Sequence, residues 1–279
     1  MNVVTPSSLF DALRAKDAHP DARALAGGTD LFAQWQAGAA RPETVIALER
    51  VHDLREITAD RDGLRIGAAV SHARLIREHE VSHGYPALAA AAQTVGAPAI
   101  RAMGTIGGNI ANASPAADLP PVLLAYDAQV VLVSLRGERS VPIAQFFTGY
   151  RRVDLAADEL IAAVWLPRPA DATHAAYLKV GTRAAQSIAK VALGAAVVLD
   201  ASRAVVHVRM AAASVAATPV RLPEVEAAIA GCRLDAATIA RAADVARTTV
   251  QPIDDVRSTA EYRARILGNL VERFLGSVA

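Results

Sequence analysis

Cysteine is nearly absent from this sequence, because Cys232 is the only one among 279 residues. A single thiol cannot form an internal disulfide. It also cannot supply the set of thiolates that a cysteine-rich zinc site or an iron–sulfur cluster requires. Any iron–sulfur cluster that works with this protein must therefore be bound by another chain.

The sequence also lacks an excess of charge of either sign and a long hydrophobic run. Lys and Arg number 29 against 28 Asp and Glu, a net charge of +1 that is too balanced for a protein binding nucleic acid through bulk electrostatics. Hydrophobic residues reach 53%, but the longest apolar run, residues 191–199, suits a buried strand. A membrane span needs roughly 20 apolar residues. Residues 1–9 lack the basic and apolar regions of a signal peptide. We therefore expect a cytoplasmic protein with no integral membrane segment and no nucleic-acid partner.

Short strands and helices follow one another along the chain without an internal repeat. Their composition predicts strands at residues 24–26, 45–48, 63–67, 129–133, 139–141, 159–166, 175–180, 190–199 and 204–212. Capping residues and helical spacing predict helices at residues 5–15, 29–37, 71–78, 85–95, 118–126, 224–230, 235–247 and 258–275. Residues 101–118 show little periodicity, so we expect a long functional loop there. The proline-bracketed residues 167–169 predict a boundary between two domains.

Two glycine-rich segments are candidates for binding a phosphate group. The first comprises Ala24, Leu25, Ala26, Gly27, Gly28, Thr29, Asp30 and Leu31, and the second runs from Thr105, Ile106, Gly107, Gly108 and Asn109 to Asp118. Paired glycines between a strand and a helix let backbone N–H groups approach a phosphate. One such pair is more often an ordinary tight turn, but two of them favour a bound dinucleotide. Neither segment matches the Rossmann or P-loop pattern, so a different nucleotide-binding fold is required.

A third motif, His-Glu-Val-Ser-His at residues 79–83, matches the H-E-x-x-H pattern of zinc proteases. That chemistry needs both histidines on one helical face and a third ligand. Gly84 and Pro86 follow at once, so the helix is expected to end there, and no third ligand stands out downstream. We therefore expect solvated residues at a helix end and no bound metal.

The glycine-rich segments resemble the FAD-binding medium subunit of the molybdenum hydroxylases, the relatives of xanthine dehydrogenase and carbon monoxide dehydrogenase. The resemblance rests on Ala-Gly-Gly-Thr-Asp-Leu at 26–31 and on Thr-Ile-Gly-Gly-Asn-Ile-Ala-Asn-Ala-Ser-Pro-Ala-Ala-Asp at 105–118. The second motif is long and specific, whereas the first alone is weak. Further matching segments follow in the expected order at residues 146–151, 158–161, 179–183, 188–191 and 255–263. The resemblance therefore spans nearly the whole chain.

The resemblance implies an α+β fold with a two-lobed FAD-binding domain of the vanillyl-alcohol-oxidase (PCMH) type over residues 1–170, with lobes of about 1–55 and 56–170. A smaller sheet-and-helix domain of the CO dehydrogenase flavoprotein C-terminal type would follow over residues 174–279. The flavin would lie between the lobes. Residues 24–31 would wrap its pyrophosphate from one lobe and residues 105–109 from the other. Asp118 would meet sugar or ribityl hydroxyls, while Ile161 and Lys179 would lie near the isoalloxazine.

Several of these residues also have an ordinary structural interpretation. Asp30 is expected at a helix N-terminus, because its charge would repel a phosphate. Asp118 precedes Leu-Pro-Pro and could also cap a helix. Lys179 is either a cation beside the flavin edge that gains negative charge on reduction or an exposed strand lysine. Tyr150 lies either near the flavin face or in the core, and whether Tyr150 or Lys190 contacts the flavin stays open.

The function that the resemblance implies is electron transfer. FAD in this chain would receive electrons from [2Fe-2S] clusters on a small subunit, which take them from a molybdopterin centre on a large subunit, and would deliver them to NAD⁺ or another acceptor. The three subunits would form a dimer of heterotrimers. No side chain of this chain is expected to be catalytic. A stand-alone FAD-dependent oxidoreductase and an assembly protein that has lost its cofactor are the alternatives, and the sequence does not identify the reducing substrate.

Overall fold

The computed structural model describes residues 1–183 and 186–279, and within them the strands form four sheets. The N-terminal sheet is parallel, with the strand order β1–β3–β2, and consists of β1 (Asn2–Val4), β2 (Arg23–Leu25) and β3 (Thr44–Ala47). Helix α1 (Leu9–Ala18) joins β1 to β2, and α2 (Leu31–Gln36) follows β2. Two short 3-10 helices, η1 (Leu48–Arg50) and η2 (His52–Arg55), lead to the next sheet.

The second sheet is antiparallel and has the strand order β4–β5–β10–β6–β7. Its strands are β4 (Ile57–Ala59), β5 (Gly63–Gly67), β6 (Gln129–Ser134), β7 (Gly137–Pro142) and β10 (Leu160–Pro167). Six helices connect β5 to β6: α3 (His72–Arg77), α4 (His79–Gly84), α5 (Pro86–Thr94), α6 (Pro98–Met103), α7 (Ile106–Ala111) and α8 (Leu119–Ala125). Helix α9 (Ile143–Phe146) and the hairpin of β8 (Phe147–Gly149) and β9 (Arg152–Val153) precede β10.

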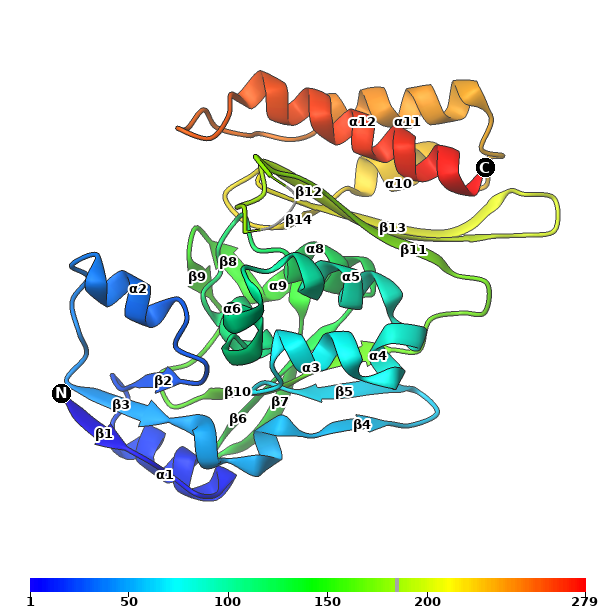
Figure 1. The fold of residues 1–279 in the computed structure, drawn as a ribbon. Helices are drawn as coiled ribbons and strands as arrows, with labels where there is room; N and C mark the ends of the chain where they lie inside the picture. The colour runs from blue at the N-terminus through cyan, green and yellow to red at the C-terminus, as the bar shows by residue number, and fades with distance from the viewer. Residues whose placement is uncertain (184–185) are drawn as a thin grey trace.

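The C-terminal sheet is antiparallel, in the order β11–β12–β13–β14. It consists of β11 (His174–Val180), β12 (Val191–Leu199), β13 (Val205–Ala213) and β14 (Val220–Arg221), and the chain ends in α10 (Pro223–Ile229), α11 (Ala236–Thr248) and α12 (Ala260–Val278). These three helices lie on one side of the sheet, while α5 and α8 lie on the other (Figure 1). The sheet is therefore the middle layer between the C-terminal helices and the body of the chain.

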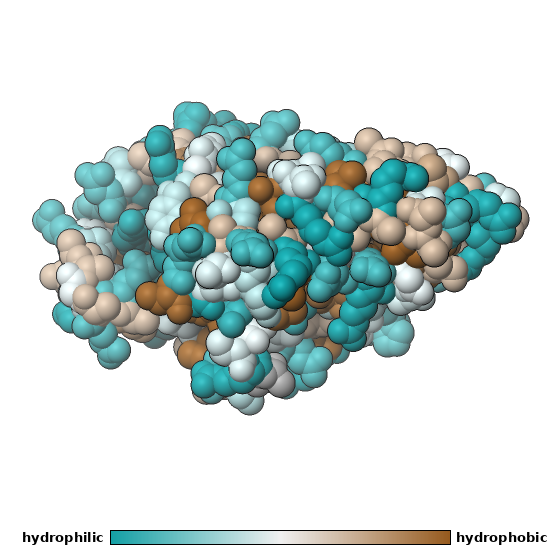
Figure 2. Space-filling view, turned by 90° about the horizontal axis from the view of Figure 1, so that it is seen from above, coloured by the Kyte–Doolittle hydropathy of each residue, from teal (hydrophilic) through white to brown (hydrophobic). Residues whose placement is uncertain are grey.

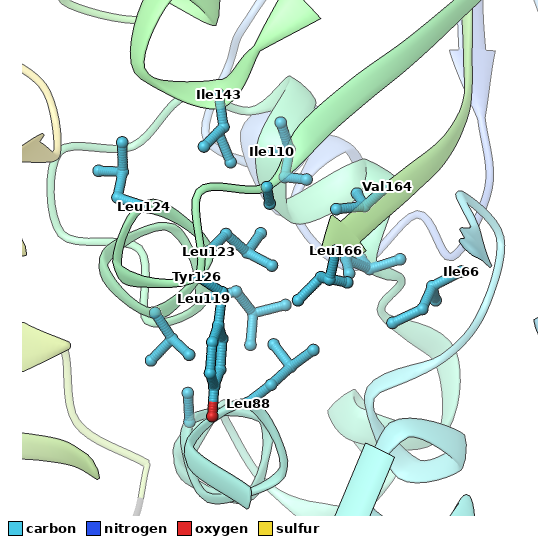
Figure 3. Close-up of a cluster of buried hydrophobic side chains, with 14 of the residues drawn as sticks. Ile66, Leu88, Ile110, Leu119, Leu123, Leu124, Tyr126, Ile143, Val164 and Leu166 are labelled. Atoms are coloured by element: carbon cyan, nitrogen blue, oxygen red, sulfur yellow. The ribbon is translucent and has the colours of Figure 1, made fainter. Parts of the chain in front are cut away.

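Helix α8 lies at the centre of the molecule, and all seven of its residues are buried. Figure 3 shows its side chains Leu119 and Leu123 directed toward Leu88 of α5 and Leu166 of β10. A helix that is apolar all round can exist only where protein surrounds it on every side. Here α5, α7 and α9 contact it from the body of the chain, and β12, β13 and β14 contact it from the C-terminal sheet. Asp118, at the N-terminus of α8, is therefore held by a rigid element.

The C-terminal sheet reaches α8 closely because a glycine stands at the point of contact. A Cβ on Gly194, in the middle of β12, would lie 2.5 Å from the backbone C and O atoms of Pro121 and 2.6 Å from the backbone N of Val122. Any side chain at this position would push the sheet away from the helix. Gly194 thus sets the distance between the two layers.

The outer face of the molecule, over α11 and α12, is largely hydrophilic. Figure 2 views the molecule from that side and shows hydrophobic residues only in small, scattered groups. Helix α12 places Leu267, Val271 and Phe274 on its buried side, as expected of an amphipathic helix that covers a sheet. In the described part of the chain, no helix combines the length and the apolar character needed to cross a membrane.

The expected elements are largely confirmed, but the short elements β1, β8, β9, β14 and α9 were not predicted, and three further differences also appear. The first helix begins at Leu9 and not at Thr5, because the Ser8 side chain accepts a hydrogen bond from the backbone N–H of Asp11 and so caps the helix. Residues 2–4 are thereby free to form β1. Strand β4 was missed. The expectation of a loop over residues 101–118 is wrong for its first part, since α6 ends at Met103 and α7 covers Ile106–Ala111. Capping by Thr105 and complete burial of Ile106 and Ile110 overcome the low helix propensity of the two glycines in α7.

Candidate functional site

The turn between β2 and α2 packs directly against the chain between α6 and α7. A Cβ on Gly27 would lie 1.9 Å from the carbonyl oxygen of Met103, and a Cβ on Gly104 would lie 3.2 Å from Thr29 Oγ1. Gly28 has φ +68°, a left-handed conformation that favours glycine. The structure thus brings together the two glycine-rich segments that lie about 80 positions apart in the sequence.

The first segment presents a run of unpaired backbone donors. In residues 1–183 and 186–279, nothing accepts a hydrogen bond from the backbone N–H of Gly27, Gly28, Thr29 or Asp30. Asp30 stands at the N-terminus of α2, as expected, although its carboxylate accepts the side-chain N–H of Gln34 and does not cap the helix. Consecutive free N–H groups around a left-handed glycine form a concave site for an anion. This turn can therefore hold a negatively charged group without a basic side chain.

The second segment differs from the expectation that its glycine N–H groups face a phosphate. The N–H groups of Ile106 and Gly107 donate to backbone carbonyl oxygens of the chain before α3, at 3.0 and 2.9 Å. The N–H of Gly108 donates to Thr105 Oγ1 at 3.1 Å. Gly107 is needed for close packing, since its Cβ would lie 2.6 Å from that of Ala68. The polar atom of this segment that is left without a hydrogen-bond partner in the described residues is the buried Asn109 Oδ1.

His72 lies behind this junction and is a residue that the sequence did not point to. It is only 2% exposed, its backbone N–H donates to Gly104 O at 3.0 Å, and its Nδ1 has no partner among the described residues. Burial, and to a smaller extent the charge of Arg101, lowers the pKa of His72 to about 4. The ring is therefore neutral at physiological pH. Nothing in the local sequence marks its burial, which arises from the helices α6 and α7 folding over it.

Asp118, Tyr177 and Lys179 form a buried polar cluster where the C-terminal sheet meets α8. Tyr177 Oη donates to Asp118 Oδ1 at 2.5 Å, and Lys179 Nζ lies 3.0 Å from Asp118 Oδ2. Burial and the nearby Asp118 carboxylate raise the pKa of Tyr177 well above its usual value, so its hydroxyl stays protonated and donates. The side chain of Lys179 is 10% exposed. The interpretation of Lys179 as an exposed strand lysine is therefore wrong. The interpretation of Asp118 as a simple helix cap is also wrong, because its side chain makes no capping hydrogen bond to α8.

The remaining candidates take different positions. Ala24 and Leu25 lie in β2, and Leu31 begins α2. Ile161 is buried in β10, beside an irregularity in the pairing with β6. The Tyr150 side chain, in the turn between β8 and β9, is 62% exposed, so its interpretation as a core residue is wrong. Lys190 Nζ lies over the ring of Tyr262, 5.4 Å from the ring centre. Tyr177 and His72 are the polar residues of the region that the sequence did not single out.

The H-E-x-x-H segment forms the short helix α4 and ends at Gly84, as expected. The rings of His79 and His83 stack with a centroid distance of 4.0 Å, and both residues are exposed. Ser82 and the His79 carbonyl oxygen lie within hydrogen-bond distance of His83 Nδ1. Within the described residues, no group of three or more His, Cys, Asp or Glu side chains is arranged to hold a metal ion.

Comparison with known proteins places these features in a family. The family described as "FAD binding domain in molybdopterin dehydrogenase" matches residues 1–169. The chain belongs to this family. A second family, described as "CO dehydrogenase flavoprotein C-terminal domain", matches residues 176–278.

Individual members are similar over almost the whole chain. The xanthine dehydrogenase FAD-binding subunit of Escherichia coli O157:H7 is 32% identical, over 96% of this chain and 92% of the relative. The carbon monoxide dehydrogenase medium chain of Hydrogenophaga pseudoflava is 33% identical, over 92% of this chain and 89% of the relative. A solved structure of carbon monoxide dehydrogenase from Hydrogenophaga pseudoflava has a chain that superimposes with a TM-score of 0.95, at 31% identity, covering 100% of this chain and 96% of that one.

The resemblance drawn from the sequence is thus confirmed, as is its α+β fold. The protein is an FAD-binding oxidoreductase subunit of a molybdenum hydroxylase of the xanthine dehydrogenase and carbon monoxide dehydrogenase type. The glycine-rich turn with free N–H groups and the unpartnered Asn109 Oδ1 fit a dinucleotide cofactor, which offers both anionic oxygens and hydrogen-bonding groups.

Proposed function

We propose that the junction of the two glycine-rich segments holds the diphosphate of FAD. The observation that carries this proposal is the run of N–H groups from Gly27 to Asp30, which find no acceptor in the described part of the chain and belong to a turn packed against Met103 and Gly104. Residues 24–31 bind the diphosphate with backbone donors, as a neutral site that needs no basic side chain. Residues Thr105–Asn109 approach it from the other lobe, where Asn109 Oδ1, which has no partner in the described residues, can accept a hydrogen bond from a hydroxyl or amino group of the cofactor.

The buried cluster at α8 continues the site. A carboxylate can accept about four hydrogen bonds, and Tyr177 and Lys179 use part of that capacity at Asp118. Asp118 is thereby oriented to accept hydrogen bonds from sugar or ribityl hydroxyls. Lys179 supplies a fixed positive charge close to the isoalloxazine, and Ile161 packs near the ring from β10. All of these side chains except Asp118 come from strands, so their positions are set by sheet pairing.

The role we propose for the chain is the exit path for electrons in a three-subunit enzyme. Bound FAD exchanges electrons one or two at a time, which links iron–sulfur clusters to a two-electron acceptor. The family resemblance implies that the clusters are [2Fe-2S] centres on a small subunit, and the single cysteine of this chain agrees with clusters bound elsewhere. The molybdopterin cofactor and the substrate are bound by a large subunit, and NAD⁺ or another acceptor takes the electrons.

The proposed assembly is a dimer of heterotrimers in the cytoplasm. Within it, this chain divides into an FAD-binding part, residues 1–170, and a C-terminal part, residues 174–279, the first with lobes of about 1–55 and 56–170. Copurification with a molybdenum-containing chain and an iron–sulfur chain is the expected result when the neighbouring subunits are produced together. Flavin-dependent substrate oxidation by this chain alone would instead favour a stand-alone oxidoreductase.

The flavin site is tested by substituting Gly27. We expect Gly27→Ala to lower the affinity for FAD by about 100-fold or more, because the new Cβ would lie 1.9 Å from the Met103 carbonyl oxygen and would separate the two segments. FAD titration followed by flavin fluorescence measures this affinity. Gly84→Ala is the matched control, since nothing lies within 4 Å of a Cβ at that position. Equal FAD affinity in both variants would contradict the assignment of the turn.

A further inference from the structure

The guanidinium group of Arg263, at the start of α12, is almost completely buried and joins three separate parts of the chain. The residue is 4% exposed. Its Nη2 donates to Asp255 Oδ1 at 2.7 Å, and its Nη1 donates to the backbone carbonyl oxygens of Lys190 at 2.9 Å and of Ser214 at 3.0 Å. Asp255 thus neutralises the buried charge, while the two carbonyls fix the start of β12 and the end of β13.

Ser214 extends this connection out of the C-terminal sheet and into the segment that precedes α8. Its backbone N–H donates to the carbonyl oxygen of Pro115 at 2.7 Å, and its hydroxyl donates to Ala189 O at 2.8 Å. Ser214 has φ +66°, a conformation that non-glycine residues rarely adopt, so surrounding contacts must hold it in place. Arg263 Nη1 supplies one of these contacts directly at the Ser214 carbonyl.

The same guanidinium also supports the strand pair that carries Lys179. The Lys190 N–H donates to Val180 O at 2.8 Å, next to Lys179 in β11, and the Lys190 carbonyl is the one that Arg263 binds. Arg263 is therefore connected to both chain segments that carry the buried cluster: the segment before Asp118 and the strand pair that includes Lys179. One path of hydrogen bonds leads through Ser214 to Pro115, three residues before Asp118, and the other leads through Lys190 to Val180, the residue after Lys179.

We infer that Arg263 is a positioning residue for the flavin site, acting through Ser214 and Lys190 on the segment Pro115–Asp118 and on Lys179. The inference rests on the proposed FAD site. It gives a role to the matching segment at residues 255–263, which otherwise lies far along the chain from the glycine-rich turns. The planar guanidinium is suited to this task because it donates to two carbonyls and a carboxylate at once, which a lysine ammonium on a flexible stem does less well.

The test compares three variants of the full chain. Arg263→Met removes all the donors, Arg263→Lys keeps the charge, and Leu275→Ala is the control. Leu275 is fully buried in the C-terminal core, so its truncation destabilises that core without touching the path to Pro115. Two quantities are measured: the dissociation constant for FAD, and the hydrogen-exchange rates of the N–H groups of Ser214 and Ala117 in the absence of flavin.

We expect Arg263→Met to weaken FAD binding by about tenfold or more, the order of effect seen when a charge-assisted hydrogen-bond network is broken. We also expect it to accelerate exchange at both N–H groups, with Arg263→Lys restoring part of each effect. Leu275→Ala, compared at equal loss of melting temperature, should leave both quantities near wild type. Equal effects of Arg263→Met and Leu275→Ala would overturn the inference by reducing Arg263 to a structural role. A wild-type chain that binds no FAD would instead overturn the proposed function, and the two failures are thus distinct.

Discussion

Single polar residues around the candidate site owe their properties to burial. His72 shows this clearly, because its pKa of about 4 results mainly from its removal from water. In the unfolded chain the ring takes up a proton near pH 6.5, whereas in the folded chain it does so only near pH 4. The stability that His72 contributes is therefore fully present above pH 6.5 and is lost as the pH falls from 6.5 toward 4.

This pH dependence is testable with His72→Leu, which cannot be protonated. Between pH 7 and pH 5 we expect the wild-type free energy of unfolding to fall by about 2 kcal/mol more than that of the variant. Urea denaturation at the two pH values measures the difference. The result that contradicts the prediction is a parallel loss of stability in the two proteins.

Asp118 shows how far the sequence leads at the scale of a residue. Its position before Leu-Pro-Pro correctly predicted the start of a helix at Leu119. The sequence could not show that Tyr177 and Lys179, about 60 positions away, form hydrogen bonds with its carboxylate. Pairing of buried groups across such a distance depends on how the C-terminal sheet sits on α8, and this has no signature in local sequence.

At the scale of elements, the contact of β12 with α8 depends on one missing side chain. The apolar run at residues 191–199 predicted a buried strand, which β12 confirms. Gly194 within it allows the backbone of Pro121 and Val122 to approach. The glycines of α7 behave similarly, since Gly107 permits close packing on Ala68. Glycines in these elements therefore mark close packing of backbones.

A pair of alanine substitutions tests this interpretation. We expect Gly194→Ala to destabilise the protein by about 3 kcal/mol, since the clash is with backbone atoms that cannot rotate away. Gly276→Ala, within α12, should instead stabilise it by about 0.5–1 kcal/mol, because nothing lies within 4 Å of a Cβ there and alanine favours helix. Thermal unfolding of both variants gives the comparison. A stable Gly194→Ala protein would show that the layers can move apart.

At the scale of the whole molecule, the layer of helices between the two sheets determines whether the FAD-binding part can fold without the C-terminal part. Helix α8 is buried on every side, with α5 beside it and the C-terminal sheet above (Figure 1). The core around α8 includes Tyr177, Ala192 and Ala211 of that sheet. Removing the C-terminal part would expose a continuous apolar surface, and each uncovered leucine costs about 1.5–3 kcal/mol.

Expression of residues 1–173 alone tests this dependence. We expect the fragment to aggregate or to bind a hydrophobic dye strongly, and we expect coexpression with residues 174–279 to restore a compact complex. Size-exclusion chromatography distinguishes these states. A monomeric, cooperatively folding fragment that binds FAD would show that the FAD-binding part does not need the C-terminal sheet.

The sequence by itself determined the family, the cofactor and most of the regular elements, because one long and specific glycine-rich motif, further matching segments, capping residues and apolar periodicity are local properties of the chain. Tertiary structure alone decided which backbone N–H groups remain free: within residues 1–183 and 186–279, those of Ile106 and Gly107 donate to carbonyls of the segment after β5, whereas those of Gly27 and Gly28 find no acceptor. It also decided the burial of His72 and the pairing of Asp118 with Lys179. These features depend on contacts between segments far apart in the chain, where packing and the need to satisfy buried polar groups outweigh local preference.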